Sequence, residues 1–357
     1  MILFLVSRSL EKSSIELKLQ ENENNQFALH RAKFATLRLL INAFQAFGAN
    51  KLHFYLEQKN TNPNLPIPFG QDFSDLSISQ LSLESFDHYY FINRSNLAFE
   101  NPTTRGQIQI LTNLLQVFSD PKNNFQPRLI PAFLGQLNDW LDFDNAPTTQ
   151  NLLQGMENYP KNFILSSPKN ALLDNLSELN ALPAFSSINV LKPSQTVYDL
   201  PIRIIKPNRV QTCDIGPLNL NMLPKTEEKF TKTLTDYFNL TQEVNLVDCG
   251  YKELYQNKDR LLQLLLQWKN QSGTSFFSSP LSENTTWAKI TDQLGAKDAK
   301  TKLDGFFSAR SHCIEVRFRL TAGKKSSFYL VHFLLDYPDQ KTELPSDVRV
   351  MLFTTLD

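Results

Sequence analysis

The sequence predicts an α/β fold, with a Rossmann-like β-α-β unit in the N-terminal half and a second α/β half that ends in an antiparallel β-hairpin. Three patterns predict this class: apolar and alternating segments near the N-terminus, a long stretch with helical periodicity, and alternating segments near the C-terminus. A length of 357 residues suits about two domains. We therefore expect a Rossmann-like domain over 1–180, a proline-punctuated connection over 181–225 and an α+β domain over 226–357.

The first sixty residues are expected to supply a strand, a helix and a further strand. Residues 2–7 are apolar without interruption and residues 15–19 alternate, and both patterns are typical of strands. Residues 27–47 have the 3.6-residue periodicity of a helix, and Gly48 stands where a helix commonly ends. Residues 51–57 alternate again and predict a strand. The expected core face of the helix comprises Phe34, Leu37, Leu40, Ile41, Phe44 and Phe47.

Further elements follow from the same patterns. Pro131 suits the first turn of a helix that continues to Leu141, and a second helix is expected to begin at Glu227, with acidic residues in its first turn. A third helix is expected to end near Gly273. Three C-terminal strands are predicted, and the first two form a hairpin; the strands are expected at 314–320, 328–335 and 348–353, with the hairpin turn at 323–325.

Composition excludes several classes of protein. There are 36 basic and 36 acidic residues, so the chain is not uniformly basic or acidic. Three widely spaced cysteines fit neither a disulfide scaffold nor a zinc ribbon, and with no secretory leader or membrane span evident they favour the cytoplasm. The common phosphate-binding, zinc-protease and kinase motifs are absent, so we expect no cofactor and no metal. His53 and His332 are interpreted as structural histidines with hydrogen-bond partners.

Basic residues gather near the C-terminus. Residues 297–325 carry eight lysines or arginines and three acidic residues, and residues 287–295 resemble the first helix and turn of a helix-turn-helix. These features predict a nucleic-acid-associated subunit of a larger assembly, with protein partners as well and no membrane contact. The candidate nucleic-acid-binding residues are Lys300, Lys302, Arg310, Arg317, Arg319, Lys324 and Lys325. Protection of an edge strand by cations is the competing interpretation.

Two enzyme hypotheses stay open beside this one. Asp142 and Asp144 form an Asp-x-Asp pair of the kind that holds a divalent cation in nucleotide-sugar glycosyltransferases, although a solvated acidic turn at a helix end is the simpler interpretation. Such an enzyme would bind its substrate between two Rossmann-like halves. Asp304, followed by Glu315 on a strand, matches part of a metal-dependent nuclease site, but Arg317 replaces the lysine expected there.

Overall fold

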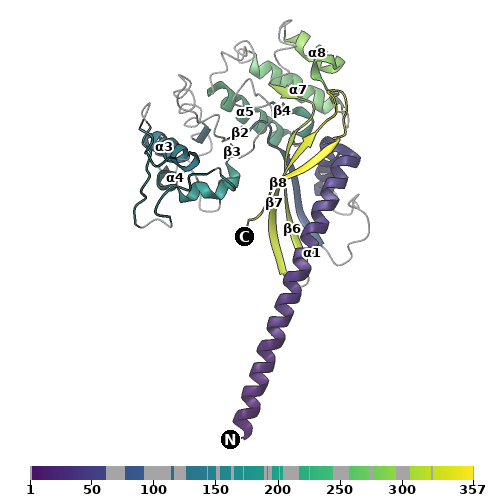
Figure 1. The fold of residues 1–357 in the computed structure, drawn as a ribbon. Coiled ribbons are helices and arrows are strands. Elements are labelled where there is room, and N and C mark those ends of the chain that lie inside the picture. Colours follow the sequence, from purple (N-terminus) through teal and green to yellow (C-terminus); the bar gives the residue numbers. More distant parts are fainter. Residues whose placement is uncertain are drawn as a thin grey trace. The chain divides into compact units, whose positions relative to one another are not determined.

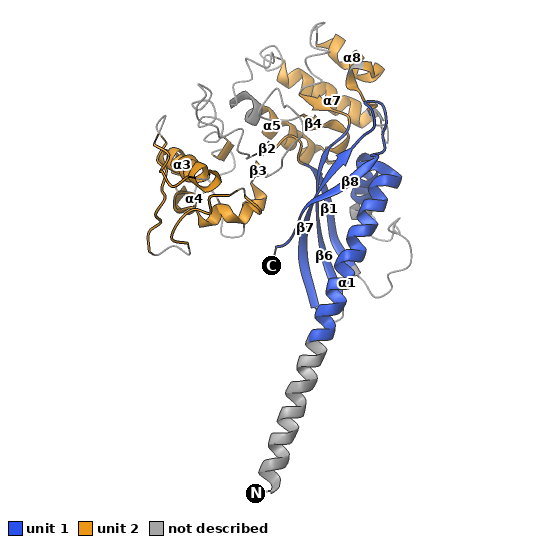
Figure 2. Ribbon diagram, viewed as in Figure 1, with its two compact units in different colours: residues 1–85, 310–357 blue, residues 86–309 orange. Residues whose placement is uncertain are grey.

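The structure is a computed structural model and consists of two compact units. Unit 1 contains Met1–Ser85 and Arg310–Asp357, and unit 2 contains Phe86–Ala309 (Figure 2). The sequence predicted a division near residues 180 and 226, whereas these units place both ends of the chain in one unit. The residues described are 2–61, 77–91, 114–115, 126–142, 144–149, 153–161, 165–171, 173–188, 191, 195–200, 202–203, 217–224, 226–243, 257–272, 277–294, 306–322 and 325–356.

Unit 1 is a long helix on a four-stranded sheet (Figure 1). The sheet order is β1-β6-β7-β8, and all three strand pairs are antiparallel. The elements of this unit are α1 (Ile2–Thr61), β1 (Ser77–Ser85), β6 (Cys313–Ala322), β7 (Lys325–Asp336) and β8 (Asp347–Thr355). The antiparallel hairpin predicted near the C-terminus is therefore confirmed as β6 and β7, and the third predicted strand as β8.

The alternation of β6 separates two faces of this sheet. Ile314, Val316, Phe318 and Leu320 are fully buried on one face. On the other face, the buried Glu315 carboxylate accepts a hydrogen bond from Arg317 Nε at 2.8 Å and lies 2.9 Å from His332 Nε2. His332 is thus a structural histidine with a partner, as predicted. The same holds for His53, whose Nδ1 lies 2.9 Å from the carbonyl oxygen of Leu83.

Helix α1 packs its small and apolar side chains against the sheet. The buried residues between 32 and 44 recur at helical spacing: Ala32, Thr36, Leu40, Ala43 and Phe44. The Phe44 ring lies 5.0 Å from that of Phe333 on β7. The predicted core face was partly wrong, because Phe34 is 61% and Phe47 is 40% exposed. Small residues such as Ala32 let the helix approach the sheet closely, and that rotates Phe34 toward solvent.

Gly48 interrupts the helical geometry within α1. Its φ of 71° lies in the left-handed region, where glycine meets no steric penalty. A Cβ atom at this position would also lie 3.0 Å from the carbonyl oxygen of Glu343. The predicted helix end at Gly48 is therefore a kink, and helical structure resumes beyond it.

The predicted Rossmann-like β-α-β unit is wrong. Residues 2–7, 15–19 and 51–57, which the sequence assigned to strands, are all helical in α1. In the last segment, Leu52 and Leu56 satisfy both a two-residue and a helical repeat, and the buried Ala49 extends their helical face. The coarser prediction of a mixed helix and strand protein is confirmed, with an antiparallel sheet as its largest sheet.

Unit 2 is mainly helical in its described part. Its helices are α3 (Ile130–Leu141), α4 (Pro183–Ile188), α5 (Glu227–Glu243), α7 (Lys258–Ser272) and α8 (Thr285–Gln293). Its strands form two short parallel pairs, β2 (Tyr90–Phe91) with β3 (Ile202–Arg203) and β4 (Leu218–Asn219) with β5 (Phe307–Ser308). The helices predicted after Pro131, from Glu227 and before Gly273 are confirmed. A buried aromatic cluster packs α5 and α8 on β5: Tyr237, Phe238, Trp287, Phe306 and Phe307.

Two phenylalanines of α1 test its packing on the sheet. We expect Phe44→Ala to lower the free energy of unfolding by about 3–5 kcal/mol, because it leaves a cavity against Phe333. Phe34→Ala removes the same atoms from an exposed position and should cost less than about 0.5 kcal/mol. Chemical denaturation of the full chain measures both, and equal losses would contradict the packing described.

Candidate functional site

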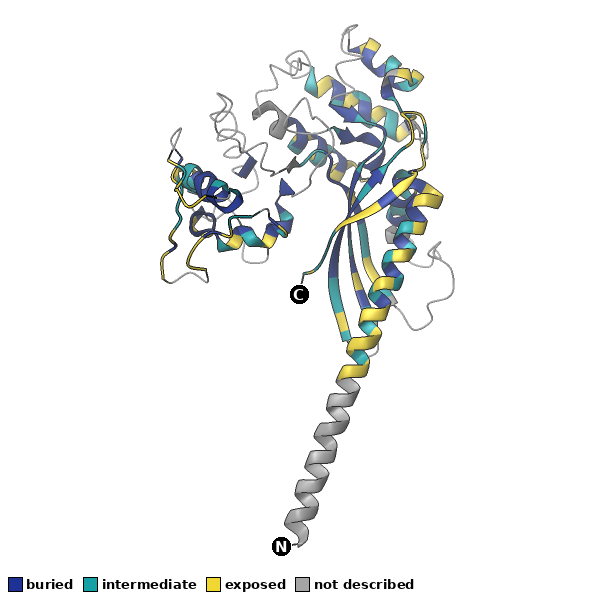
Figure 3. Cartoon of the chain, in the orientation of Figure 1, coloured by how far each residue is buried: buried dark blue, intermediate teal, exposed yellow. Residues whose placement is uncertain are grey.

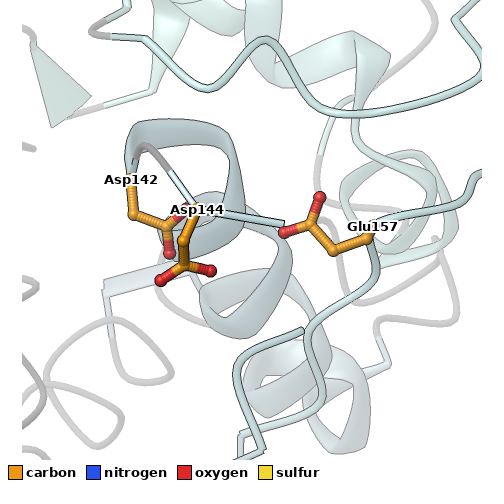
Figure 4. Close-up of side chains that lie close together, drawn as sticks. All are labelled: Asp142, Asp144 and Glu157. Carbon is orange, nitrogen blue, oxygen red and sulfur yellow. The ribbon is translucent and has the colours of Figure 1, made fainter. Parts of the chain in front are cut away.

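Three carboxylates of unit 2 meet at the end of α3. One oxygen from each of Asp142, Asp144 and Glu157 lies within 4.8 Å of the others (Figure 4). Asp142 directly follows the last turn of α3, and Asp144 lies two residues further on. Glu157 comes from the returning loop. We call these three residues the carboxylate cluster.

A fourth carboxylate holds the loop that delivers Glu157. Asp139 is completely buried in α3; its Oδ1 accepts a hydrogen bond from Thr148 N at 2.8 Å and its Oδ2 one from Met156 N at 2.5 Å. The two ends of the 148–156 segment are therefore fixed to the same side chain. The adjacent Met156 places Glu157 beside α3.

Two glycines permit the close approach of this loop to α3. A Cβ atom on Gly155 would lie 2.2 Å from Asp139 Oδ2, and one on Gly135 would lie 2.5 Å from Gly155 N. Both distances are shorter than Cβ atoms tolerate, so the helix and the loop need glycine at these positions. The sequence has only 11 glycines, and two of them are used here.

Charge repulsion and burial change the protonation of the cluster. The pKa of Glu157 is raised from 4.5 to about 7, first by burial and then by Asp139, Asp142 and Asp144. Burial together with Asp139 and Glu157 also raises the pKa of the Tyr159 hydroxyl. Near neutral pH, a proton on Glu157 therefore relieves part of the repulsion in the cluster.

A hard cation is the other way to offset these charges. Carboxylate oxygens are the ligands that Ca²⁺ prefers, and the cluster offers three from two separate segments. Asp144 Oδ1 accepts a hydrogen bond from Ala146 N at 2.8 Å, which orients this carboxylate. The donor set therefore fits a divalent cation chemically, and the expectation of no metal stays a prediction that the calcium measurement below tests.

The sequence identified only part of this arrangement. The Asp-x-Asp pair was noticed, but a solvated turn was preferred, and the structure instead brings Glu157 against the pair. No local pattern marks Glu157, because the Asp139 hydrogen bonds create its proximity to α3. Gly155, one of few glycines in the chain, is the single sequence feature that could have indicated a close approach.

The predicted nucleic-acid-binding residues do not form one free cationic surface in the described part of the chain. Arg310 donates to the backbone carbonyls of Asp339 and Thr342 at 2.7 and 3.1 Å, and its guanidinium lies 4.5 Å from the centre of the Tyr337 ring. Arg317 and Arg319 share one face of β6, but Arg317 is paired with Glu315. Lys325 is half-buried at the start of β7. Lys300, Lys302 and Lys324 lie outside the described residues.

The described residues do not support the two enzyme hypotheses either. Glu315, the expected nuclease carboxylate, is buried between Arg317 and His332. Asp304 lies outside the described residues, and so does most of the second helix of the expected helix-turn-helix. A glycosyltransferase site between Rossmann-like halves has no basis in the described elements, which contain no such halves.

No protein-family model matches the chain, and no curated protein does. A solved chain from "The Crystal Structure of the GspK-GspI-GspJ complex from enterotoxigenic Escherichia coli Type 2 Secretion System" is similar, with 13% sequence identity and a TM-score of 0.45. The similarity covers 95% of this chain and 99% of that chain.

The contacts of the basic residues correct the functional prediction. Arg310 and Arg317, two of the proposed phosphate-binding residues, have intramolecular partners. The prediction of a nucleic-acid-associated, DNA-binding protein is therefore wrong. Among the residues described, none of the helices combines the length and apolar character needed to span a bilayer.

The raised pKa of Glu157 predicts a pH dependence of stability. Between pH 4.5 and about 7 the folded chain binds more protons at this residue than the unfolded chain, so stability falls as pH rises through this window. Glu157→Gln should remove this dependence. Because solvent screens a partly exposed side chain, we expect a melting temperature about 2–4 °C above wild type at pH 8. Thermal melts at pH 4.5, where the two proteins should agree, provide the control.

Calcium should compete with that proton. At pH 8 we expect millimolar calcium chloride to raise the melting temperature of the wild-type chain by a few degrees, since the cation binds the folded state alone. Asp144→Asn removes one charge but keeps the oxygen that accepts from Ala146 N, so it should respond less. Identical responses of the two proteins would show that calcium does not bind at the cluster.

Proposed function

We propose that the chain is a subunit of a protein assembly and that it binds its partner through the exposed side of α1. The observation that carries this proposal is the exposure of two large aromatic side chains on one helix: Phe27 is 72% and Phe34 is 61% exposed. They are separated by seven residues, so they lie on nearly the same side of the helix. Figure 3 shows exposed residues concentrated at the N-terminal end of the part of α1 that is coloured by burial.

The residues around these rings define one surface. We call it the α1 stripe; its members are Glu23, Phe27, His30, Arg31, Phe34 and Arg38, all exposed. The centroid of the His30 ring lies 5.2 Å from that of the Phe34 ring, so the two rings are neighbours on this surface. Ala32, Thr36 and Leu40, which face the sheet, are on a different side of the helix.

The physical argument is that the sheet does not cover the stripe. Isolated exposed apolar residues are common on protein surfaces, whereas aligned aromatic residues on a helix are typical of helix recognition. Neither Arg31 nor Arg38 forms an ion pair with any residue that the structure describes. The stripe therefore offers a partner both apolar area and positive charge.

A pair of matched substitutions tests this function. Phe34→Ser should weaken partner binding about 10-fold or more, because burial of a phenylalanine contributes about 1.5–3 kcal/mol. Met351→Ser is the control, since Met351 is a 41% exposed apolar residue of β8. The measurement is the native size of the tagged full chain, expressed in the cells it comes from, by size-exclusion chromatography.

Each outcome bears on the proposal. The wild-type and Met351→Ser chains should elute in a complex heavier than the 41.0 kDa chain, whereas Phe34→Ser should elute largely free of it. Elution of the wild-type chain as a monomer would refute the assignment to an assembly. Retention of Phe34→Ser in the complex would show that another surface binds the partner.

A further inference from the structure

The charges of the α1 stripe specify the partner more closely. We infer that α1 pairs with α1 of a second copy of this chain, in antiparallel orientation, about a two-fold axis that passes between His30 and Arg31. This inference rests on the proposed function and assigns the occupant of the same surface. It follows from the order of charged and aromatic residues along the stripe.

The aromatic and charged residues of the α1 stripe are placed symmetrically about one point of the helix. Going outward from the point between His30 and Arg31, Phe27 and Phe34 come at equal distances on the two sides. Glu23 and Arg38 come next, again at equal distances, four residues beyond each phenylalanine. A two-fold axis at this point therefore places Phe27 against the partner's Phe34, and Arg38 against the partner's Glu23.

The resulting interface is closed and self-complementary. Two aromatic contacts lie at its centre, and two Glu–Arg pairs lie at its ends, one for each copy. Both contacts are generated twice by the same operation, as a two-fold dimer requires. The side chains concerned are exposed, so pairing would need no rearrangement of the helix.

The parallel orientation is disfavoured by the same charges. In a parallel pair, Arg31, Arg38 and Glu23 would each face the identical residue of the other copy, and like charges at close range repel. An unrelated acidic helix would satisfy Arg31 and Arg38 but would repel Glu23. A second antiparallel copy is the arrangement in which both Glu23 and Arg38 face an opposite charge.

Charge reversal in the purified full chain tests the pairing. Sedimentation equilibrium over a range of concentrations should show a monomer–dimer equilibrium for the wild-type chain. Glu23→Arg and Arg38→Glu should each weaken the dimer about 10-fold or more, because each places like charges at both ends. The double variant Glu23→Arg/Arg38→Glu restores opposite charges and should recover dimerisation to within about 3-fold of wild type.

The single variants also distinguish the orientations. In a parallel dimer, positions 23 and 38 each face themselves in the wild-type chain and in every variant, so neither single substitution should weaken that dimer. Single variants that dimerise like wild type, or a double variant that fails to recover, would overturn the antiparallel pairing. A wild-type chain that stays monomeric at all concentrations would overturn the second copy as the partner. In that case the loss of the cellular complex in Phe34→Ser would still support the proposed function, so the two failures are separable. Met351→Ser, which should dimerise like wild type, controls for nonspecific apolar association.

Discussion

The contact between α1 and the antiparallel sheet is the interaction on which unit 1 depends. Four fully buried side chains of β6 form an apolar surface, and α1 covers it with small residues and Phe44. Lys33 contributes from the flank, with its ammonium 4.1 Å from the centre of the Phe353 ring on β8. Because a helix has more than one side, the orientation that buries Ala32 and Leu40 also determines which residues remain in water.

Unit 2 uses a different means of holding chain segments together. A single buried aspartate, Asp139, accepts backbone hydrogen bonds from both ends of a loop, and two glycines allow the loop to come close. The arrangement concentrates negative charge, since three more carboxylates lie nearby. The raised pKa of Glu157 results first from its burial and then from the repulsion of these neighbouring carboxylates.

Parts of this architecture could be predicted from the sequence, and the reasons are physical. The alternation of residues 314–320 fits a strand and not a helix, because charged and apolar side chains there occupy opposite faces of β6. Residues 51–57 were assigned to the wrong structure, because Leu52 and Leu56 fit both a strand and a helix repeat. The helix was predicted correctly around Phe34, but its buried side was not. Hydrophobicity favours Phe34 over Ala32, whereas close packing on the sheet favours the smaller residue.

The candidate site was less predictable than the fold. Asp142 and Asp144 are close in sequence and were found as a pair, but Glu157 joins them only through the hydrogen bonds of Asp139. The basic residues near the C-terminus suggested a polyanion-binding surface. The sequence shows which residues are charged, but it does not show which groups pair with them in the fold. In the structure, Glu315 neutralises Arg317, and backbone carbonyls bind Arg310.

The way the chain connects the two units determines where its sequence can gain or lose residues. Ser85 and Ile314 are register partners at the ends of β1 and β6, so the whole of unit 2 leaves the sheet and rejoins it at one place. A short turn that joins Ser85 to Arg310 could replace unit 2 and would leave every paired residue of the sheet in place. The intervening 224-residue segment (Phe86–Ala309) is therefore exchangeable in principle, and its length and content are free to diverge while the helix-and-sheet scaffold stays constant.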